Sequence, residues 1–300
     1  MPIPARGTRI VRQEAGGSRW EVAIRAPPAH LAPYIRDIMG YTEQTPISSR
    51  RRELPGPMVV VILEIGPPIR VRGASGRAER FPGGFVAGVD DGPTVCEHDG
   101  FQSGVQLNLT PVGARLFFGL PMSELTRRVV PFGDVVARTH ADLVERLHDA
   151  RTWDARFDLV ERMLDERVAA PSDRARVVSW AVRRIEAAGG DVDMRRLARE
   201  LGYSRKHVID LFHDQVGVPP KLLARIVRFD ALMRHLRVGG AGTWAELAQR
   251  FGYYDQAHLV REVRQFTGMT PTEARGTLID FASFQDAEVN SVQDASDAPL

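Results

Sequence analysis

The densest group of reactive side chains in this 300-residue sequence is the run Cys96-Glu97-His98-Asp99. A thiol, an imidazole and two carboxylates could ligate a metal ion or provide a Cys–His nucleophile. Successive side chains of a strand point to opposite faces, so Cys96 and His98 could share a face from which Glu97 is excluded. A catalytic metal needs about three protein ligands on one face, yet the sequence has one cysteine and no His-x-His pair. We interpret the run as a surface turn and predict no catalytic residue, no metal ligand and no cofactor.

A different chemistry is indicated by two similar segments that lie 50 residues apart. The segment 197–203 reads Leu-Ala-Arg-Glu-Leu-Gly-Tyr, and the segment 247–253 reads Leu-Ala-Gln-Arg-Phe-Gly-Tyr. Each predicts a short helix, a tight glycine turn and a second, capped helix, which is the helix-turn-helix arrangement. The apolar stripe from Leu222 to Leu236 predicts a longer helix that joins the two units.

Basic residues are concentrated where the two units lie. Residues 176–279 contain 17 Lys+Arg and 11 Asp+Glu, which is a net charge of +6. Residues 1–175 contain 23 Lys+Arg and 22 Asp+Glu, and residues 280–300 contain no Lys or Arg and 5 Asp+Glu. The net charge of +2 for the whole chain therefore conceals a basic block that is followed by an acidic end. This asymmetry indicates nucleic acid as a partner. The alternative is codon bias, because 38 of the 40 basic residues are arginine.

In these features the segment 176–279 resembles the DNA-binding domain of the AraC/XylS family of bacterial transcription regulators. The resemblance implies double-stranded DNA as the partner, with the second helix of each unit in one of two successive major grooves, ~34 Å apart. It also implies contact with RNA polymerase and a homodimer formed through the helices of residues 141–170. The matching residues are Leu197-Ala198, Leu201-Gly202-Tyr203-Ser204, Phe212, Gly217, Pro220, Arg228, Leu247-Ala248, Phe251-Gly252-Tyr253, Asp255-Gln256, Leu259, Gly268, Thr270-Pro271 and Arg275.

The same resemblance assigns the DNA-binding residues, on reading helices over 204–214 and 255–267. Arginine and glutamine read bases through paired hydrogen bonds, so Gln256 and Arg261 fit this role well. Asp210 would repel phosphate, and Ser204 is better explained as a helix cap, so we expect the second unit to supply more of the specificity. The predicted DNA-binding residues are Ser204, Arg205, Lys206, His207, Ile209 and Asp210 in the first unit, and Gln256, Ala257, His258 and Arg261 in the second.

The N-terminal half has a different pattern. Short apolar segments separated by Gly-Pro turns predict a small β-barrel or sandwich over the first ~110 residues. The continuous apolar run Met58–Ile65 is typical of a buried strand. Leu31, Tyr34, Ile35 and Ile38 are spaced as on a helix, which predicts an early helix.

We therefore predict an α+β chain: a cupin-like N-terminal small β-barrel domain with helices, then an all-α domain of about seven helices carrying two helix-turn-helix units. Residues 1–172 form a sensory and dimerisation domain, β-rich over 1–110 and helical over 111–170. Residues 173–279 form the DNA-binding domain, and the acidic tail 280–300 is predicted to be disordered.

The predicted function is that of a sequence-specific DNA-binding transcription regulator of AraC/XylS type, modulated by a small-molecule effector or partner at the N-terminal domain. No apolar run reaches the ~18–20 residues of a membrane span, and no signal core is present. These features predict a cytoplasmic protein without a membrane partner. Two alternatives stay open here: a metal- or small-molecule-dependent barrel enzyme with a helical appendage, and a protein–protein adaptor built on helices.

Overall fold

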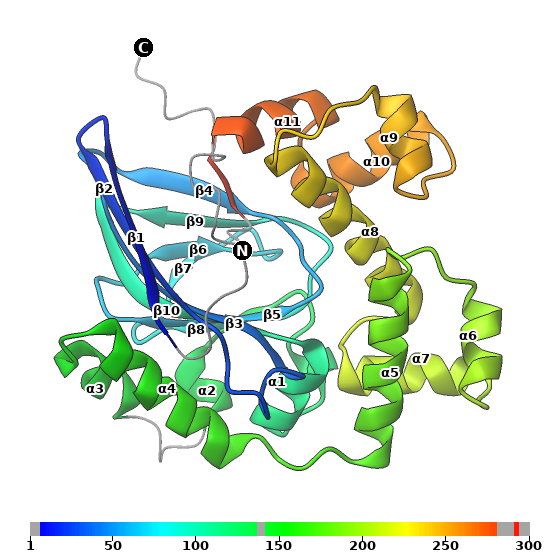
Figure 1. Ribbon diagram of the computed structural model, residues 1–300, viewed down its shortest axis with the longest axis horizontal. Helices are drawn as coiled ribbons and strands as arrows, with labels where there is room; N and C mark the ends of the chain where they lie inside the picture. The colour runs from blue at the N-terminus through cyan, green and yellow to red at the C-terminus, as the bar shows by residue number, and fades with distance from the viewer. Residues whose placement is uncertain (1–6, 137–141, 281–290, 294–300) are drawn as a thin grey trace.

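The computed structural model describes residues 7–136, 142–280 and 291–293, with a sheet-rich N-terminal domain beside a group of C-terminal helices (Figure 1). Two sheets, antiparallel throughout, make up the first domain. The larger sheet has the strand order β1 (Arg9–Ala15), β2 (Ser18–Arg25), β3 (Ile35–Gln44), β10 (Phe101–Leu109), β5 (Val59–Glu64), β8 (Phe85–Ala87) and β11 (Val129–Pro131). The smaller sheet has the order β12 (Ser291–Gln293), β4 (Ser49–Glu53), β9 (Thr94–His98), β6 (Arg70–Arg72) and β7 (Ala78–Arg80).

The centre of the larger sheet is apolar because its middle strands are rich in β-branched residues. On β10, Val105 pairs with Gly40 of β3 on one side and with Leu63 of β5 on the other. Gly40 is required there, since a Cβ would lie 2.3 Å from the ring of Trp153. The expected β-rich fold is confirmed, and its two sheets do not close into one barrel.

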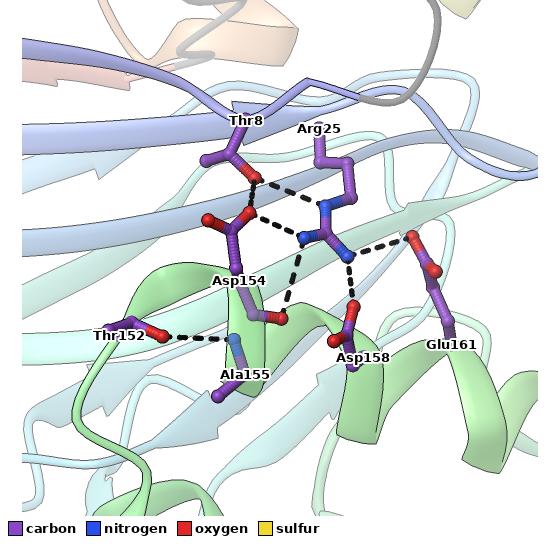
Figure 2. A network of polar contacts seen from close by, with 7 residues as sticks. All are labelled: Thr8, Arg25, Thr152, Asp154, Ala155, Asp158 and Glu161. Atoms are coloured by element: carbon purple, nitrogen blue, oxygen red, sulfur yellow. Dashed lines mark hydrogen bonds and ion pairs between the residues drawn. The ribbon is translucent and has the colours of Figure 1, made fainter.

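Helices that follow the strands cover the larger sheet: α1 (Pro111–Phe118), the 3-10 helix η1 (Met122–Glu124), α2 (Phe132–Val135), α3 (Leu143–Asp149) and α4 (Trp153–Arg167). A buried arginine attaches α4 to the sheet (Figure 2). The guanidinium of Arg25, on β2, donates to the carboxylates of Asp154 and Asp158, each at 2.6 Å, and Glu161 lies 3.5 Å away. Although burial opposes the shift, these carboxylates raise the pKa of Arg25.

The C-terminal part consists of seven helices between residues 173 and 280: α5 (Asp173–Ala187), α6 (Met194–Glu200), α7 (Arg205–Gln215), α8 (Pro220–Arg237), α9 (Trp244–Arg250), α10 (Gln256–Thr267) and α11 (Pro271–Asp280). In Figure 1, α8 runs between the α9–α10 pair and the α6–α7 pair. One apolar cluster extends from Val105 in the sheet to Phe229 on α8 and Phe266 on α10. The two parts of the chain therefore share a continuous core.

Two sequence expectations for the secondary structure need correction. The segment of Leu31 and Ile35 forms turns and then enters β3, because Pro27, Pro28 and Pro33 interrupt any helix there. In the acidic tail, predicted to be disordered, residues 291–293 form β12, which pairs with β4. The rest of that tail, residues 281–290 and 294–300, lies outside the described residues.

Candidate nucleic-acid interface

The first helix-turn-helix unit is built by a glycine turn and a serine cap. Between α6 and α7, Gly202 has a φ of 71°, a left-handed conformation that side chains disfavour. The Ser204 hydroxyl accepts a hydrogen bond from the N–H of His207 at 3.2 Å and so begins α7. Val208 and Phe212 are buried on the inner face of α7. The outer face of α7 is exposed to solvent.

The second unit repeats this construction. Gly252 also has a φ of 71°, and the Asp255 carboxylate accepts a hydrogen bond from the N–H of His258 at 2.7 Å. Leu259 and Phe266 are fully buried on the inner face of α10. Because both units have a positive-φ glycine and a polar cap, the second helix of each unit, α7 or α10, begins in the same way.

Most of the predicted contact residues lie on exposed faces. In the first unit, Ser204 to His207, Ile209 and Asp210 are exposed, and Ser204 is engaged as the cap. The His207 ring packs against that of Tyr203, with centroids 4.6 Å apart. In the second unit, Gln256, Ala257 and Arg261 are exposed.

His258 differs from the other predicted contacts because the domain itself engages its ring. Its Nδ1 accepts a hydrogen bond from the N–H of Tyr254 at 3.2 Å, and its Nε2 lies 3.0 Å from Glu262 Oε2. Glu262 is 2% exposed, and Arg225 of α8 lies at 3.2 Å from its other oxygen. The ring of His258 is therefore engaged within the second unit, and Glu262 makes the contact with α8.

Sequence reasoning missed two exposed side chains beside the second reading face. Arg264 lies on α10 one turn after Arg261 and is exposed, and Tyr254 is 92% exposed just before the helix. The spacing of three residues from Arg261, which places both side chains on the same side of a helix, could have identified Arg264 from the sequence. Tyr254 could have been recognised as the second of two tyrosines that directly follow Gly252. On α8, Arg228 packs its guanidinium over the Tyr253 ring at 5.3 Å.

A basic groove runs between the two units. It is lined by Lys221, Arg225 and Arg228 of α8, by Arg261 and Gln265 of α10, and by the loop that precedes α6. The groove joins the linking helix to the second reading helix, and four Lys and Arg side chains line it together with one carboxylate, that of Glu262.

The family comparison agrees with this geometry: a family described as "Helix-turn-helix domain" matches residues 197–277. The C-terminal part of the chain therefore contains a helix-turn-helix domain. A second family, described as a domain of unknown function (DUF6597), matches residues 24–131. No curated protein matches the chain.

Among solved structures, the chain is similar to ToxT from Vibrio cholerae, with 8% identity over 80% of this chain and 97% of that one, at a TM-score of 0.46. It is similar to the C-terminal domain of AraT, a response regulator from Geobacillus stearothermophilus, with 20% identity over 35% and 88% of the two chains, at a TM-score of 0.33. It is also similar to CuxR, an AraC-like transcriptional activator, with 19% identity over 76% of this chain and 86% of that one, at a TM-score of 0.33.

Beside the helix-turn-helix domain, the N-terminal domain contains a cavity of about 170 Å³ between its two sheets. Its walls are largely apolar, and carboxylates project among them. Glu43 is the most fully paired: despite its burial, His98, Arg51 and Gln102 lower its pKa to about 2. The lining includes Val22, Met39, Tyr41, Leu54, Met58, Val60, Ile62, Ile69, Phe85 and Ala87 among its apolar and aromatic residues.

Two other carboxylates of the cavity have no cation in contact among the described residues. Burial raises the pKa of Glu53 to about 7, against the charges of Arg51 and Arg237. Burial also raises the pKa of Asp90, against the hydrogen bonds that it accepts from the N–H groups of Asp91 and Gly92. The cavity is therefore apolar, with more carboxyl groups than basic side chains in its lining.

The reactive run at Cys96 is not the surface turn expected from the sequence. Cys96 and His98 lie on β9 and line the cavity, and His98 is 5% exposed. Burial raises the pKa of the Cys96 thiol, which opposes its use as a nucleophile. Over the described residues, no group of His, Cys, Asp and Glu has the geometry of a metal site, and no helix is long and apolar enough to cross a membrane.

Proposed function

We propose that the chain is a sequence-specific transcription regulator whose α7 and α10 read successive major grooves of double-stranded DNA. The observation that carries this proposal is the repetition of one unit, with an exposed polar face on each second helix, at the two ends of α8. The 18 residues of α8 span ~27 Å at the rise of an α-helix. That length is close to the ~34 Å between major grooves on one face of B-DNA.

In this proposal the exposed residues divide into base-reading and backbone-binding groups. Arg261 and Gln256 supply the paired donors and acceptors that distinguish guanine and adenine. Lys206, Arg205 and His207 bind phosphate, and the net charge of +6 over 176–279 draws the domain to DNA. Ser204 is a cap, and His258 positions α10. Ile209 and Ala257 make apolar contact with thymine methyl groups, and Asp210 lowers affinity for the backbone.

We assign the N-terminal cavity to a small effector with an apolar body and one positive charge. The apolar walls favour such a body, and Glu53 and Asp90 provide carboxylates without a contacting cation. A carboxylate ligand would instead be repelled. Contact with RNA polymerase, a homodimer and a cytoplasmic location belong to the same proposal, which assigns no catalytic activity to the chain.

The DNA-binding proposal is tested by selecting bound duplexes from a random DNA pool with the full-length protein. We expect an enriched sequence whose affinity falls steeply with salt, because bound phosphates release counterions. A pool that yields no enriched sequence, with binding equal for every duplex, would overturn the proposal.

The effector proposal is tested by the melting temperature in the presence of matched probes. Benzylamine should raise the melting temperature and benzoate should not, because only the amine complements Glu53 and Asp90. Glu53→Gln should reduce the response to benzylamine, whereas Glu14→Gln, on an exposed side chain of β1, should leave it unchanged. A response to benzoate alone would overturn the charge assignment.

A further inference from the structure

The C-terminal end of α7 is held by the N-terminal domain. The Thr126 hydroxyl donates a hydrogen bond to the carbonyl oxygen of Gly217 at 2.7 Å. Arg115 lies 3.6 Å from the Asp214 carboxylate. Gly217 has a φ of 89°, and a Cβ there would lie 2.5 Å from the Thr126 hydroxyl and 2.8 Å from the Met122 carbonyl oxygen. The end of the first reading helix is therefore seated closely on the η1 segment.

The C-terminal end of α10 is held by the same domain. The Gln265 side-chain amide donates to the Asp91 carboxylate at 3.0 Å and accepts from Arg225 of α8 at 2.7 Å. The Arg52 guanidinium donates to the carbonyl oxygen of Thr267 at 2.7 Å. Thus Gln265 connects the second reading helix to the linking helix and to the N-terminal domain at once.

The two loops that make these contacts are bound to each other. Arg127 donates to the Asp91 carboxylate at 2.6 Å, and its N–H donates to the Val89 carbonyl oxygen at 3.2 Å. Arg127 has a φ of 55°, a positive value that no other non-glycine residue adopts in the described part of the chain. A Cβ at Gly88 would lie 1.9 Å from the Leu125 carbonyl oxygen. We call these two loops, residues 88–92 and 122–128, the bracket.

The bracket also forms part of the cavity wall. Gly88, Asp90 and Gly92 line the cavity, while Asp91, between two of them, faces α10. A molecule that enters the cavity therefore contacts the same short loop that holds the second reading helix.

We propose that the bracket is a positioning device that fixes α7 and α10 relative to each other, with Thr126 and Asp91 as its positioning residues. The proposal rests on the proposed DNA-binding function. Its contacts are at the C-terminal ends of the two helices, and the N-terminal halves that carry Lys206 and Arg261 stay exposed. The bracketed arrangement is thus competent to bind DNA, and fixing it in advance removes part of the ordering cost of binding two grooves at once.

The test uses the full-length chain and the duplex enriched by selection. Asp91→Ala and Gln265→Ala should each weaken binding about fivefold, in the range of one hydrogen bond. The double variant should be weakened about fivefold as well, rather than about 25-fold, because both substitutions remove the same contact. Thr126→Val should act in the same direction, and Thr126→Ser, which keeps the hydroxyl, should restore wild-type affinity.

Each variant is compared on two duplexes and with one matched control. Binding to a duplex containing one half-site should be unchanged in Asp91→Ala, Thr126→Val and Thr126→Ser, which also shows that these variants fold. Asp99→Ala is the control, because Asp99 pairs with Arg70 and Arg80 within the N-terminal domain. Wild-type affinity in Asp91→Ala, or multiplication of the two single effects, would overturn the proposal. Failure of the wild-type chain to enrich any sequence would instead reject the DNA-binding function.

Discussion

The Nε2 atom of His258 lies 3.0 Å from the Oε2 atom of Glu262, one turn later on α10. Glu262 is almost completely buried, and Arg225 of α8 contacts its other oxygen at 3.2 Å. A carboxylate buried between two helices is stable only when its partners are present. This contact is therefore one of the elements that holds the second reading helix against the linking helix.

Glu262→Ala should lower the free energy of unfolding by ~2 kcal/mol, less than the ~3–5 kcal/mol of a fully buried pair because Arg225 and His258 can regain water. Chemical denaturation of the full-length chain measures this value. The control is Glu200→Ala, which breaks the exposed pair with Arg196 at 2.7 Å and should cost no more than ~0.5 kcal/mol. Equal effects of the two substitutions would show that Glu262 is not a structural link.

Arg261→Ala and Lys206→Ala should affect DNA binding in different ways. Loss of Arg261 should reduce discrimination at one base position by ~1–3 kcal/mol, as expected of a bidentate base contact. Loss of Lys206 should weaken binding to all sequences alike and reduce the salt slope by about one. Affinities for the selected duplex and for single-base variants, at fixed salt, separate the two outcomes. Our ranking of the units is wrong if Lys206→Ala abolishes discrimination and Arg261→Ala retains it.

The glycine turns and caps of both units followed from local sequence. Gly202, Gly252, Ser204 and Asp255 act through neighbours no more than a few residues away. Such features depend only on local backbone geometry, which the sequence specifies directly.

Features that depend on distant segments were not predictable from the sequence. The cavity arises where strands from both sheets enclose Cys96 and His98, and local patterns suggested a surface turn for this run. The contact between Asp91 and Gln265 joins residues separated by 174 positions. Helical spacing around Leu31 was misleading, because apolar residues of a turn and of the strand that follows it fell by chance at the same intervals.

The buried Glu64 should make stability depend on pH. One of its oxygens accepts a hydrogen bond from the Ile69 N–H at 3.1 Å, and burial raises its pKa to about 7. Between the ordinary carboxyl pKa and about 7, the folded chain holds a proton that the unfolded chain has released. The free energy of unfolding therefore decreases as pH rises through this interval, by ~3 kcal/mol for a shift of this size.

Glu64→Gln should remove the contribution of Glu64 and leave that of Glu53, whose pKa is also raised to about 7, so that the variant gains stability relative to the wild type as the pH is raised from 5 to 8. Denaturation curves at several pH values measure the difference. Glu14→Gln, at a side chain that is 71% exposed, should leave the pH profile unchanged. A constant difference between Glu64→Gln and the wild type from pH 5 to 8 would contradict the expected titration.

Arg25→Ala should detach α4 from the sheet. The guanidinium is 9% exposed and is paired at 2.6 Å with both Asp154 and Asp158 (Figure 2). Since these carboxylates are more than half exposed and can regain water, we expect a loss of ~2 kcal/mol in the free energy of unfolding. Arg12→Ala, which removes an exposed pair with Glu21, should cost no more than ~0.5 kcal/mol. A smaller loss for Arg25 than for Arg12 would contradict the assigned role.

The most direct measurement of the central claim is a hydroxyl-radical footprint of the full-length chain on its selected duplex. Two protected patches should lie about one helical turn apart on the same face of the DNA. Gln256→Ala with Arg261→Ala should remove protection from one patch, and Arg205→Ala with Lys206→Ala should remove it from the other. A single patch that both pairs of substitutions weaken equally would contradict the claim that α7 and α10 occupy separate grooves.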